Sequence, residues 1–322
     1  MSEISNIKAF IKPEMDKFDP FFKKAVKSNV PLLDIIMNYI IRRKGKQMRP
    51  MFVFLSAKLT GAVTESTYTA AALIELLHTA TLIHDDVVDN SNKRRGFFSI
   101  NALWRSKIAV LAGDYLLSKG MLLAIRNKEF ELLEIVSEAV KEIAEGELLQ
   151  LEKSRKLDIS EETYFEIIYK KTATLIASCT ASGAASAKAD KNQIEKLKQF
   201  GKYAGITFQI KDDLFDYQKT NLTGKPTGND IQEKKMTLPL IYALNNASKS
   251  EKKHILKLIG KPSNKQVKQI IDFVKEKQGL EYTEKIMEKH KNSALNALND
   301  FSETEAKKHL ENLVHYITVR KK

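Results

Sequence analysis

The stretch Leu82-Ile83-His84-Asp85-Asp86-Val87-Val88-Asp89-Asn90 contains a D-D-x-x-D motif at the end of a long apolar run with helical spacing. Asp85 and Asp89 are four residues apart, so a helix places both carboxylates on one face, roughly 6 Å apart along its axis. Like charges at that spacing repel each other, and within an apolar helix they need a cation between them. Mg²⁺ prefers such oxygen ligands and commonly shares them with substrate phosphates. The motif therefore predicts a helix end that binds Mg²⁺ and a diphosphate.

A second copy of the motif, Asp212-Asp213-Leu214-Phe215-Asp216, again ends an apolar helical run. A single acidic cluster is usually a solvated surface, but two copies at helix ends can face each other and clamp one metal-bound diphosphate. The pair Arg94-Arg95 follows the first motif, and guanidinium groups bind phosphate in a bidentate manner. The predicted metal ligands are Asp85, Asp86, Asp89, Asp212, Asp213 and Asp216.

Composition favours one large helical domain over residues 1–322. The chain is 43% hydrophobic, and its low counts of glycine (13) and proline (7) argue against a loop-rich β fold. A single cysteine, Cys179, excludes an intrachain disulfide and is consistent with a reducing compartment. The N-terminus lacks the pattern of a signal peptide, and no uncharged apolar run of 18 residues occurs. We therefore expect a cytoplasmic protein without a transmembrane segment.

The net charge of +13 indicates anionic ligands rather than a particular fold. The lysines are spread along the chain and no nucleic-acid-binding motif occurs, so we expect no nucleic-acid partner. The basic C-terminus, Val319-Arg320-Lys321-Lys322, is more typical of a solvated end than of a lipid contact, although weak membrane contact during product release stays open.

Several further motifs follow one another along the chain: Gly45-Lys46-Gln47-Met48-Arg49-Pro50, His78, Gly113-Asp114, Lys171-Thr172, and Gln209 before the second motif. Together with the two Asp-rich motifs, they make the chain resemble the trans-isoprenyl diphosphate synthases, the polyprenyl synthetase family. The resemblance runs from about Gly45 to the C-terminal helices and is strongest with bacterial medium- and long-chain synthases of the octaprenyl type. It implies the all-α isoprenoid synthase fold, a single-domain helical bundle around a deep central cavity.

The resemblance also implies an activity. A synthase of this family condenses isopentenyl diphosphate head-to-tail onto an allylic diphosphate, such as farnesyl diphosphate, and releases pyrophosphate. It implies about three Mg²⁺ ions, held by Asp85 and Asp89 on one wall and by Asp212 on the other, and it implies a homodimer. The residues implied in catalysis are Asp85, Asp89, Arg94, Lys171 and Asp212.

Family resemblance assigns the substrate-binding residues as well. Lys46, Arg49 and Arg95 would hold isopentenyl diphosphate, while Arg94 and Lys171 would grip the allylic diphosphate. His78 is placed near isopentenyl diphosphate, although a lone histidine on an apolar helix is more often a core residue. The remaining residues implied in substrate binding are Thr172, Gln209, Lys225 and Lys235.

Product length is expected to depend on the helix before Asp85. Helical geometry places Thr81, Leu77 and Ile74 near its face, four, eight and eleven residues earlier. Short-chain relatives commonly carry bulky side chains four or five residues before the motif, whereas Thr81 and Ala80 are small here. Leu77 and Ile74 either narrow the tunnel deeper down or belong to the core. We expect products of about C30 to C50, used as precursors of quinone side chains.

Three other readings remain. A short-chain synthase that makes farnesyl or geranylgeranyl diphosphate is the closest competitor. A class I terpene cyclase would not need Lys46, Arg49 and Arg95 as a second phosphate site. A non-catalytic partner subunit of a heteromeric synthase would lack the Asp motifs.

Overall fold

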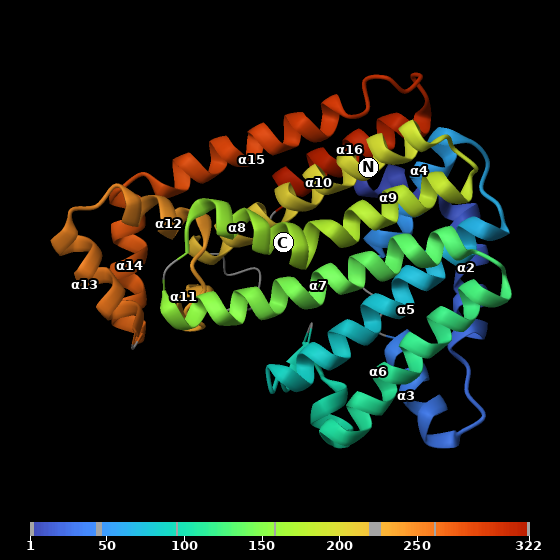
Figure 1. Cartoon of the computed structure of the whole chain (residues 1–322), viewed down its shortest axis with the longest axis horizontal. Helices are drawn as coiled ribbons and strands as arrows, with labels where there is room; N and C mark the ends of the chain where they lie inside the picture. Colours follow the sequence, from blue (N-terminus) through green and yellow to red (C-terminus); the bar gives the residue numbers. More distant parts are fainter. Residues whose placement is uncertain are drawn as a thin grey trace. The chain divides into compact units, whose positions relative to one another are not determined.

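A computed structural model describes residues 3–42, 47–94, 96–157, 159–218, 227–260 and 262–320. These residues are almost entirely helical, which confirms the predicted all-α class (Figure 1). Two two-residue strands, β1 (Lys93–Arg94) and β2 (Phe97–Phe98), pair as an antiparallel hairpin. The chain divides into two compact units, one of residues 1–140, 178–198 and 301–310, the other of residues 141–177, 199–300 and 311–322. The single-domain organisation stays a prediction.

The helices fall into three groups. Those of the first unit are α1 (Glu3–Phe10), α2 (Lys12–Val26), α3 (Pro31–Ile41), α4 (Met48–Thr60), α5 (Glu65–Val88) and α6 (Ile100–Arg126). Those of the second unit are α8 (Glu161–Ile168), the π-helix η1 (Tyr169–Ala173), α11 (Asn229–Gln232), α12 (Leu238–Asn245), α13 (Lys249–Gly260), α14 (Asn264–Glu276) and α15 (Gly279–Asn296). Four helices have residues in both units, namely α7 (Phe130–Lys156), α9 (Thr174–Ser186), α10 (Lys191–Tyr217) and α16 (Glu305–Val319).

Helix α5 carries the first Asp-rich motif and is buried nearly all round over its first half. From Ala70 to Leu77, every residue except Glu75 is buried. The helix begins at a capping box, in which the Thr64 backbone N–H donates to Thr67 Oγ1 at 3.1 Å. It packs along α6 (Figure 1). The all-round apolar pattern of this segment thus produces a core helix that ends in acidic residues.

Helices α4 and α9 approach each other closely in the first unit because Gly183 has no side chain. A Cβ atom at this position would lie 2.4 Å from the Val53 carbonyl oxygen and 2.9 Å from Ser56 Cβ. We expect Gly183→Ala to lower the free energy of unfolding by about 2 kcal/mol, because backbone must move to admit the methyl group. Urea denaturation checks this. Gly260→Ala is the matched control, since a Cβ there meets no atom within 4 Å; equal effects of the two changes would contradict the argument.

The second unit has its own apolar core, formed by α8, α10, α12, α13, α14 and α15. Helix α10 passes close to η1, where a Cβ at Gly205 would lie 2.5 Å from Ala173 Cα. Tyr217, at the end of α10, is 1% exposed and its hydroxyl bonds to Thr237 Oγ1 at 2.8 Å. This packing fixes the helix end that carries the second Asp-rich motif.

Helix α6 exposes more apolar surface than a core helix does. Within the described ranges it is the one helix whose length and composition would suffice to cross a membrane, and 33% of its apolar window is buried. Buried core helices of other proteins pass the same test, and α6 carries Asp114 and Lys119 inside its sequence. Its exposed large apolar residues are Leu103, Val110, Leu111, Met121, Leu122 and Ile125.

Candidate active site

The first motif occupies the last turn of α5. Asp85 is half-buried, Asp89 is exposed, and Asp86 is 4% exposed. Asp89 caps the helix, and its backbone N–H donates to the Asp85 carbonyl oxygen at 2.8 Å. The predicted helical register is thus confirmed: Asp85 and Asp89 follow one another along the accessible side of α5, while Asp86 turns inward.

The accessible side of α5 extends from the motif down the helix. Glu75, His78, Leu82, Asp85 and Asp89 recur at intervals of three and four residues, and none of them is buried. This spacing defines one helix face. We call these five residues the α5 stripe.

The positions expected to set product length divide between this stripe and the core. Thr81 is half-buried beside the stripe, whereas Ala80 and Ile74 have no exposed surface. Leu77 is 4% exposed and faces Gly120 of α6, where an added Cβ would lie 3.2 Å from Leu77 Cδ2. Leu77 and Ile74 therefore belong to the core, and Thr81 is the position of the four that borders accessible space.

The segment after the first motif is tied back to α5. Ser99 begins α6, accepts a hydrogen bond from the Ala102 N–H, and donates from Oγ to the Ser91 carbonyl oxygen at 2.6 Å. Asn101 Nδ2 donates to the Asp86 carbonyl oxygen at 3.4 Å. The backbone of Arg94 lies in β1. Four predicted phosphate contacts lie outside the described residues, namely Lys46, Arg95, Lys225 and the side chain of Arg94.

The three acids of the second motif have three different environments. Asp213 is 4% exposed, and it accepts hydrogen bonds from the Tyr164 hydroxyl at 2.7 Å and from Gln209 Nε2 at 2.8 Å. Thr172 Oγ1 donates to Gln209 Oε1 at 2.8 Å, which links η1 to the same network. Burial raises the pKa of Asp213 to about 8, with the Asp230 carboxylate adding to the effect. Both Asp213 oxygens therefore have protein partners.

Asp216 caps the short helix α11. Its carboxylate accepts from the backbone N–H groups of Asn229 at 2.9 Å and Asp230 at 3.1 Å. Burial, and then the neighbouring Asp230 carboxylate, raise the pKa of Asp216 to about 6. Asp216 thus links the end of α10 to the first residues of α11.

Asp212 is accessible, with 41% of its side chain exposed. Arg320, whose side chain is only 10% exposed, donates from Nη2 to Asp212 Oδ1 at 2.7 Å. The same guanidinium lies over the Phe208 ring, 4.0 Å from its centroid. A mostly buried arginine therefore holds an acid that is itself partly open to solvent.

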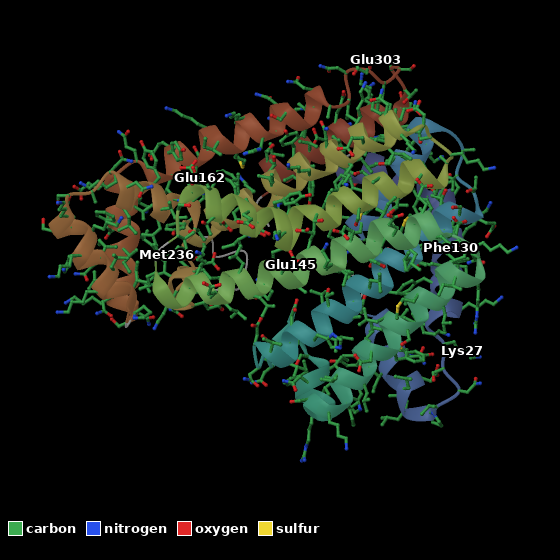
Figure 2. The ribbon with its side chains drawn as sticks, viewed as in Figure 1. Lys27, Phe130, Glu145, Glu162, Met236 and Glu303 are labelled. Atoms are coloured by element: carbon green, nitrogen blue, oxygen red, sulfur yellow. The ribbon has the colours of Figure 1, made fainter. Side chains whose placement is uncertain are left out.

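Lys171 lies in η1, where the helix widens to π-helical geometry as is frequent at functional sites. Its ammonium group pairs with Glu147 Oε2 at 2.6 Å and donates to Gln150 Oε1 at 2.8 Å. The preceding Lys170 pairs instead with Glu145 Oε2 at 2.7 Å. Figure 2 labels Glu145 on α7. The two neighbouring lysines thus pair with different glutamates of α7. Lys235 pairs with the exposed Glu233.

These residues fit a metal site that is completed by substrate. No cluster of three or more His, Cys, Asp or Glu side chains suited to a metal ion occurs in the part of the chain that the structure describes. Mg²⁺ commonly takes one or two carboxylates together with phosphate oxygens and water. Asp85 and Asp89 form such a pair in the first unit, and Asp212 is an accessible carboxylate of the second unit.

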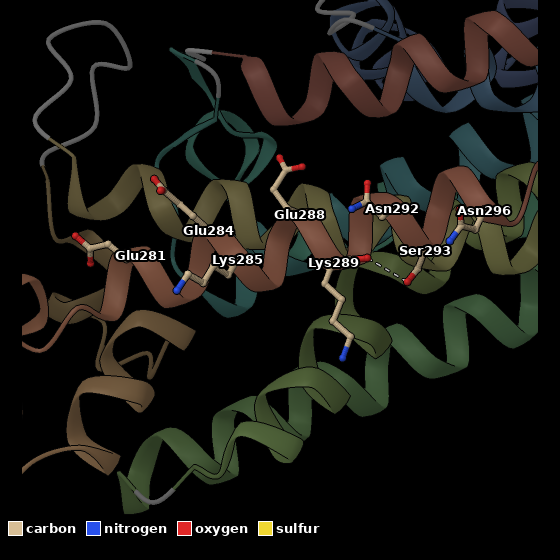
Figure 3. Close-up of a pocket in the computed structure, with 8 residues that line it drawn as sticks. All are labelled: Glu281, Glu284, Lys285, Glu288, Lys289, Asn292, Ser293 and Asn296. Atoms are coloured by element: carbon tan, nitrogen blue, oxygen red, sulfur yellow. Dashed lines mark hydrogen bonds between the residues drawn. The ribbon is translucent and has the colours of Figure 1, made fainter.

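A surface hollow of about 760 Å³ lies elsewhere, along α15. Its lining comes from this single helix, and Figure 3 shows Glu288 and Lys289 pointing to opposite sides of it. The lining residues are all polar or charged, with both glutamates and lysines among them, so the hollow does not suit an apolar chain. The hollow does not belong to the candidate site.

Several of these residues could not be found from sequence motifs. Glu75 and Tyr164 are recognised only through their partners, and the pairings of Glu147 with Lys171 and of Arg320 with Asp212 likewise appear only in the structure. His84 is not part of a motif that we assigned a function, but it contacts one of the family motifs, Gly113-Asp114. A Cβ at Gly113 would lie 2.2 Å from His84 Nε2, and His84 lies 3.4 Å from the Asp114 carboxylate.

Comparison with known proteins agrees with this geometry. Residues 30–274 match the sequence model of the polyprenyl synthetase family. The octaprenyl diphosphate synthase of Escherichia coli is 35% identical over 91% of this chain and 91% of its own. A short chain isoprenyl diphosphate synthase of Methanothermobacter thermautotrophicus is 35% identical over 88% of each chain.

Solved structures share the fold as well. A polyprenyl synthase from Caulobacter crescentus, crystallised with calcium and isoprenyl diphosphate, superposes with a TM-score of 0.91 at 31% identity, covering 99% of this chain and 98% of its own. The fold is therefore the isoprenoid synthase fold that the sequence predicted. With the family match spanning most of the chain, this protein belongs to the polyprenyl synthetase family.

Proposed function

We propose that this chain is a Mg²⁺-dependent trans-prenyltransferase that condenses isopentenyl diphosphate onto an allylic diphosphate and releases pyrophosphate. The observation that carries the proposal is the pair of D-D-x-x-D motifs, each at a helix end with an accessible carboxylate, Asp85 and Asp89 in one and Asp212 in the other. The Caulobacter crescentus relative, crystallised with calcium and isoprenyl diphosphate, supports a site of this chemistry.

Each group of residues has a defined task in this proposal. When bound, Mg²⁺ would neutralise the negative charge that develops on the departing pyrophosphate. Lys171 and Arg94 grip this leaving group, which is electrostatic stabilisation where charge develops. Lys46, Arg49 and Arg95 hold isopentenyl diphosphate so that its double bond attacks the allylic cation, and a proton is then lost. His78 and the Thr172–Gln209 pair orient the two substrates.

We further propose products of about C30 to C50. The small Thr81 beside the α5 stripe supports this, because a bulky residue there would close the space below Asp85. The octaprenyl relative supports a long product, whereas the Methanothermobacter relative supports a short one at equal identity. A short-chain synthase therefore remains the second candidate.

The decisive experiment is product analysis. Purified protein is incubated with farnesyl diphosphate, labelled isopentenyl diphosphate and Mg²⁺, and the dephosphorylated products are sized by chromatography. A band at or above C30 supports the long-chain proposal. A longest product of C20 would support the proposed reaction but identify the protein as a short-chain synthase. Absence of Mg²⁺-dependent incorporation, also with geranyl and dimethylallyl diphosphate, would contradict the proposed reaction.

We also propose that the chain forms a homodimer through the exposed apolar side of α6. Six large apolar residues on one helix form a patch of a kind that usually marks an interface. The backbone of α6 leaves helical geometry at Arg105, and the part that continues to Arg126 is about 30 Å long, so with its flanking side chains it can provide the roughly 800 Å² per partner of a standard interface.

The dimer makes a testable prediction. Leu111 is 59% exposed on α6, and we expect Leu111→Arg to shift the protein from dimer to monomer at micromolar concentration. Light scattering coupled to size-exclusion chromatography measures this mass. Val319→Arg, at a similarly exposed residue outside α6, is the control. If Leu111→Arg stays a dimer, the interface does not lie on α6. If the wild type is a monomer that binds lipid vesicles, the apolar side of α6 contacts a membrane instead of a second copy.

A further inference from the structure

Arg49 of α4 is held by an acid from α5. Its Nε donates to Glu75 Oε1 at 2.6 Å, and the two side chains are 22% and 16% exposed. Glu75 is the one charged residue in the buried first half of α5 after Glu65, and it begins the α5 stripe. Two charges this far from water are costly unless they are paired. The pair thus fixes the Arg49 guanidinium beside the accessible side of α5.

Lys171 is held in the same way in the second unit. Glu147 of α7 lies 2.6 Å from its ammonium group, and the two side chains are 25% and 33% exposed. Gly146 permits this approach, since a Cβ there would lie 2.7 Å from Lys170 Cβ and 3.0 Å from the Lys171 backbone nitrogen. Lys171 donates to Gln150 Oε1 as well. A long, flexible lysine is therefore confined to one place by two side chains of one helix.

We propose that Glu75 and Glu147 are positioning residues, one for each diphosphate. Glu75 orients Arg49 toward isopentenyl diphosphate, and Glu147 orients Lys171 toward the allylic diphosphate. This inference rests on the proposed function, which assigns the two cations to different substrates. Holding a flexible cation in its working position removes an entropic cost that substrate binding would otherwise carry. Neither glutamate touches the reacting atoms, so each acts through its cation.

The substitutions Glu75→Gln and Glu147→Gln test the proposal because they keep the side-chain shape and remove the charge. We expect Glu75→Gln to raise the KM for isopentenyl diphosphate about tenfold while the KM for the allylic diphosphate changes less than twofold. Glu147→Gln should do the reverse. Calorimetric binding of isopentenyl diphosphate alone to the Glu75→Gln protein gives a readout that is independent of turnover, and the same weakening is expected there.

Two ion pairs of the chain provide matched controls. Glu14 lies 2.8 Å from Lys58 on α4, the helix that carries Arg49, and Glu145 pairs with Lys170 beside Lys171. Neither lysine is assigned to a substrate. Glu14→Gln and Glu145→Gln should therefore leave both KM values unchanged. If the controls shifted KM as much as the test variants, the effect would be general electrostatics and the proposal would fail.

A purely structural role gives a different result. If the two ion pairs only connect helices, Glu75→Gln and Glu147→Gln lower the melting temperature. Each variant then changes the KM values for both substrates equally, or changes neither KM value. Either pattern overturns the proposal while leaving the reaction assigned. Failure of the wild type to incorporate isopentenyl diphosphate would instead overturn the proposed function itself, so the two failures are distinguishable.

Discussion

Replacement of Asp85 by alanine should lower turnover by about 10³-fold, the largest effect we expect of any single change. Asp85 is half-buried on the α5 stripe and has Asp89 one turn further along the same face. Without its carboxylate, the helix end would lose one of two oxygen donors for a divalent cation beside the leaving group. Single-turnover rates with farnesyl and isopentenyl diphosphates measure the loss.

The fold should survive this change. Asp85 lies in the last turn of α5 on its accessible side, and its replacement leaves the buried apolar residues of that helix, down to Ala80 and Ile83, unchanged. The far-ultraviolet circular dichroism and the melting temperature of Asp85→Ala should therefore match the wild type. If the folded Asp85→Ala variant turned over within tenfold of the wild-type rate, the first motif would not take part in the reaction as proposed.

Introduction of a large side chain at Thr81 should shorten the product by several isoprene units. Thr81 is the predicted length-setting residue that borders accessible space, four residues before Asp85. A phenylalanine there would fill the space below the site while leaving both Asp motifs untouched. We expect Thr81→Phe to stop at C15 to C20 with its rate of first condensation little changed. Chromatography of the dephosphorylated products checks this.

Ala80 is the informative comparison. It has no exposed surface and lies on the other side of α5 from Asp85, so Ala80→Tyr must displace packed neighbours. We expect Ala80→Tyr to lower the melting temperature as well as to shorten the product, whereas Thr81→Phe should do only the second. Unchanged product length in both variants would mean that the growing chain does not pass this part of α5.

Helix positions were the most predictable part of the structure. Apolar residues recur at helical spacing in the sequence over 65–89, 130–153 and 191–217, and the structure places α5, α7 and α10 there. Such long amphipathic or buried patterns are governed by local periodicity, which one sequence displays. The helical spacing over 160–187 does not reveal the π-helix η1 within it, because a π-helix depends on how Lys171 and Thr172 are held by other helices.

The roles within each motif were less predictable than the motifs. The spacing of the motif does not distinguish Asp212, Asp213 and Asp216, and only the family resemblance singles out Asp212. In the structure, Asp213 is buried against Tyr164 and Asp216 caps α11, while Asp212 is held by Arg320. These partners lie between 13 and 108 residues away in the chain, and no local pattern encodes them. The assignment of Asp212 alone to a metal remains a prediction, as do the roles of Lys46, Arg95 and Lys225.

The contact between Arg320 and Asp212 has a practical consequence for handling the protein. The Arg320 side chain is only 10% exposed, bonds to Asp212 and lies over the ring of Phe208 on α10. A variant shortened or interrupted ahead of Arg320 would lose this contact and change the surroundings of Asp212. Metal titrations should therefore be compared only between proteins in which α16 and Arg320 are intact.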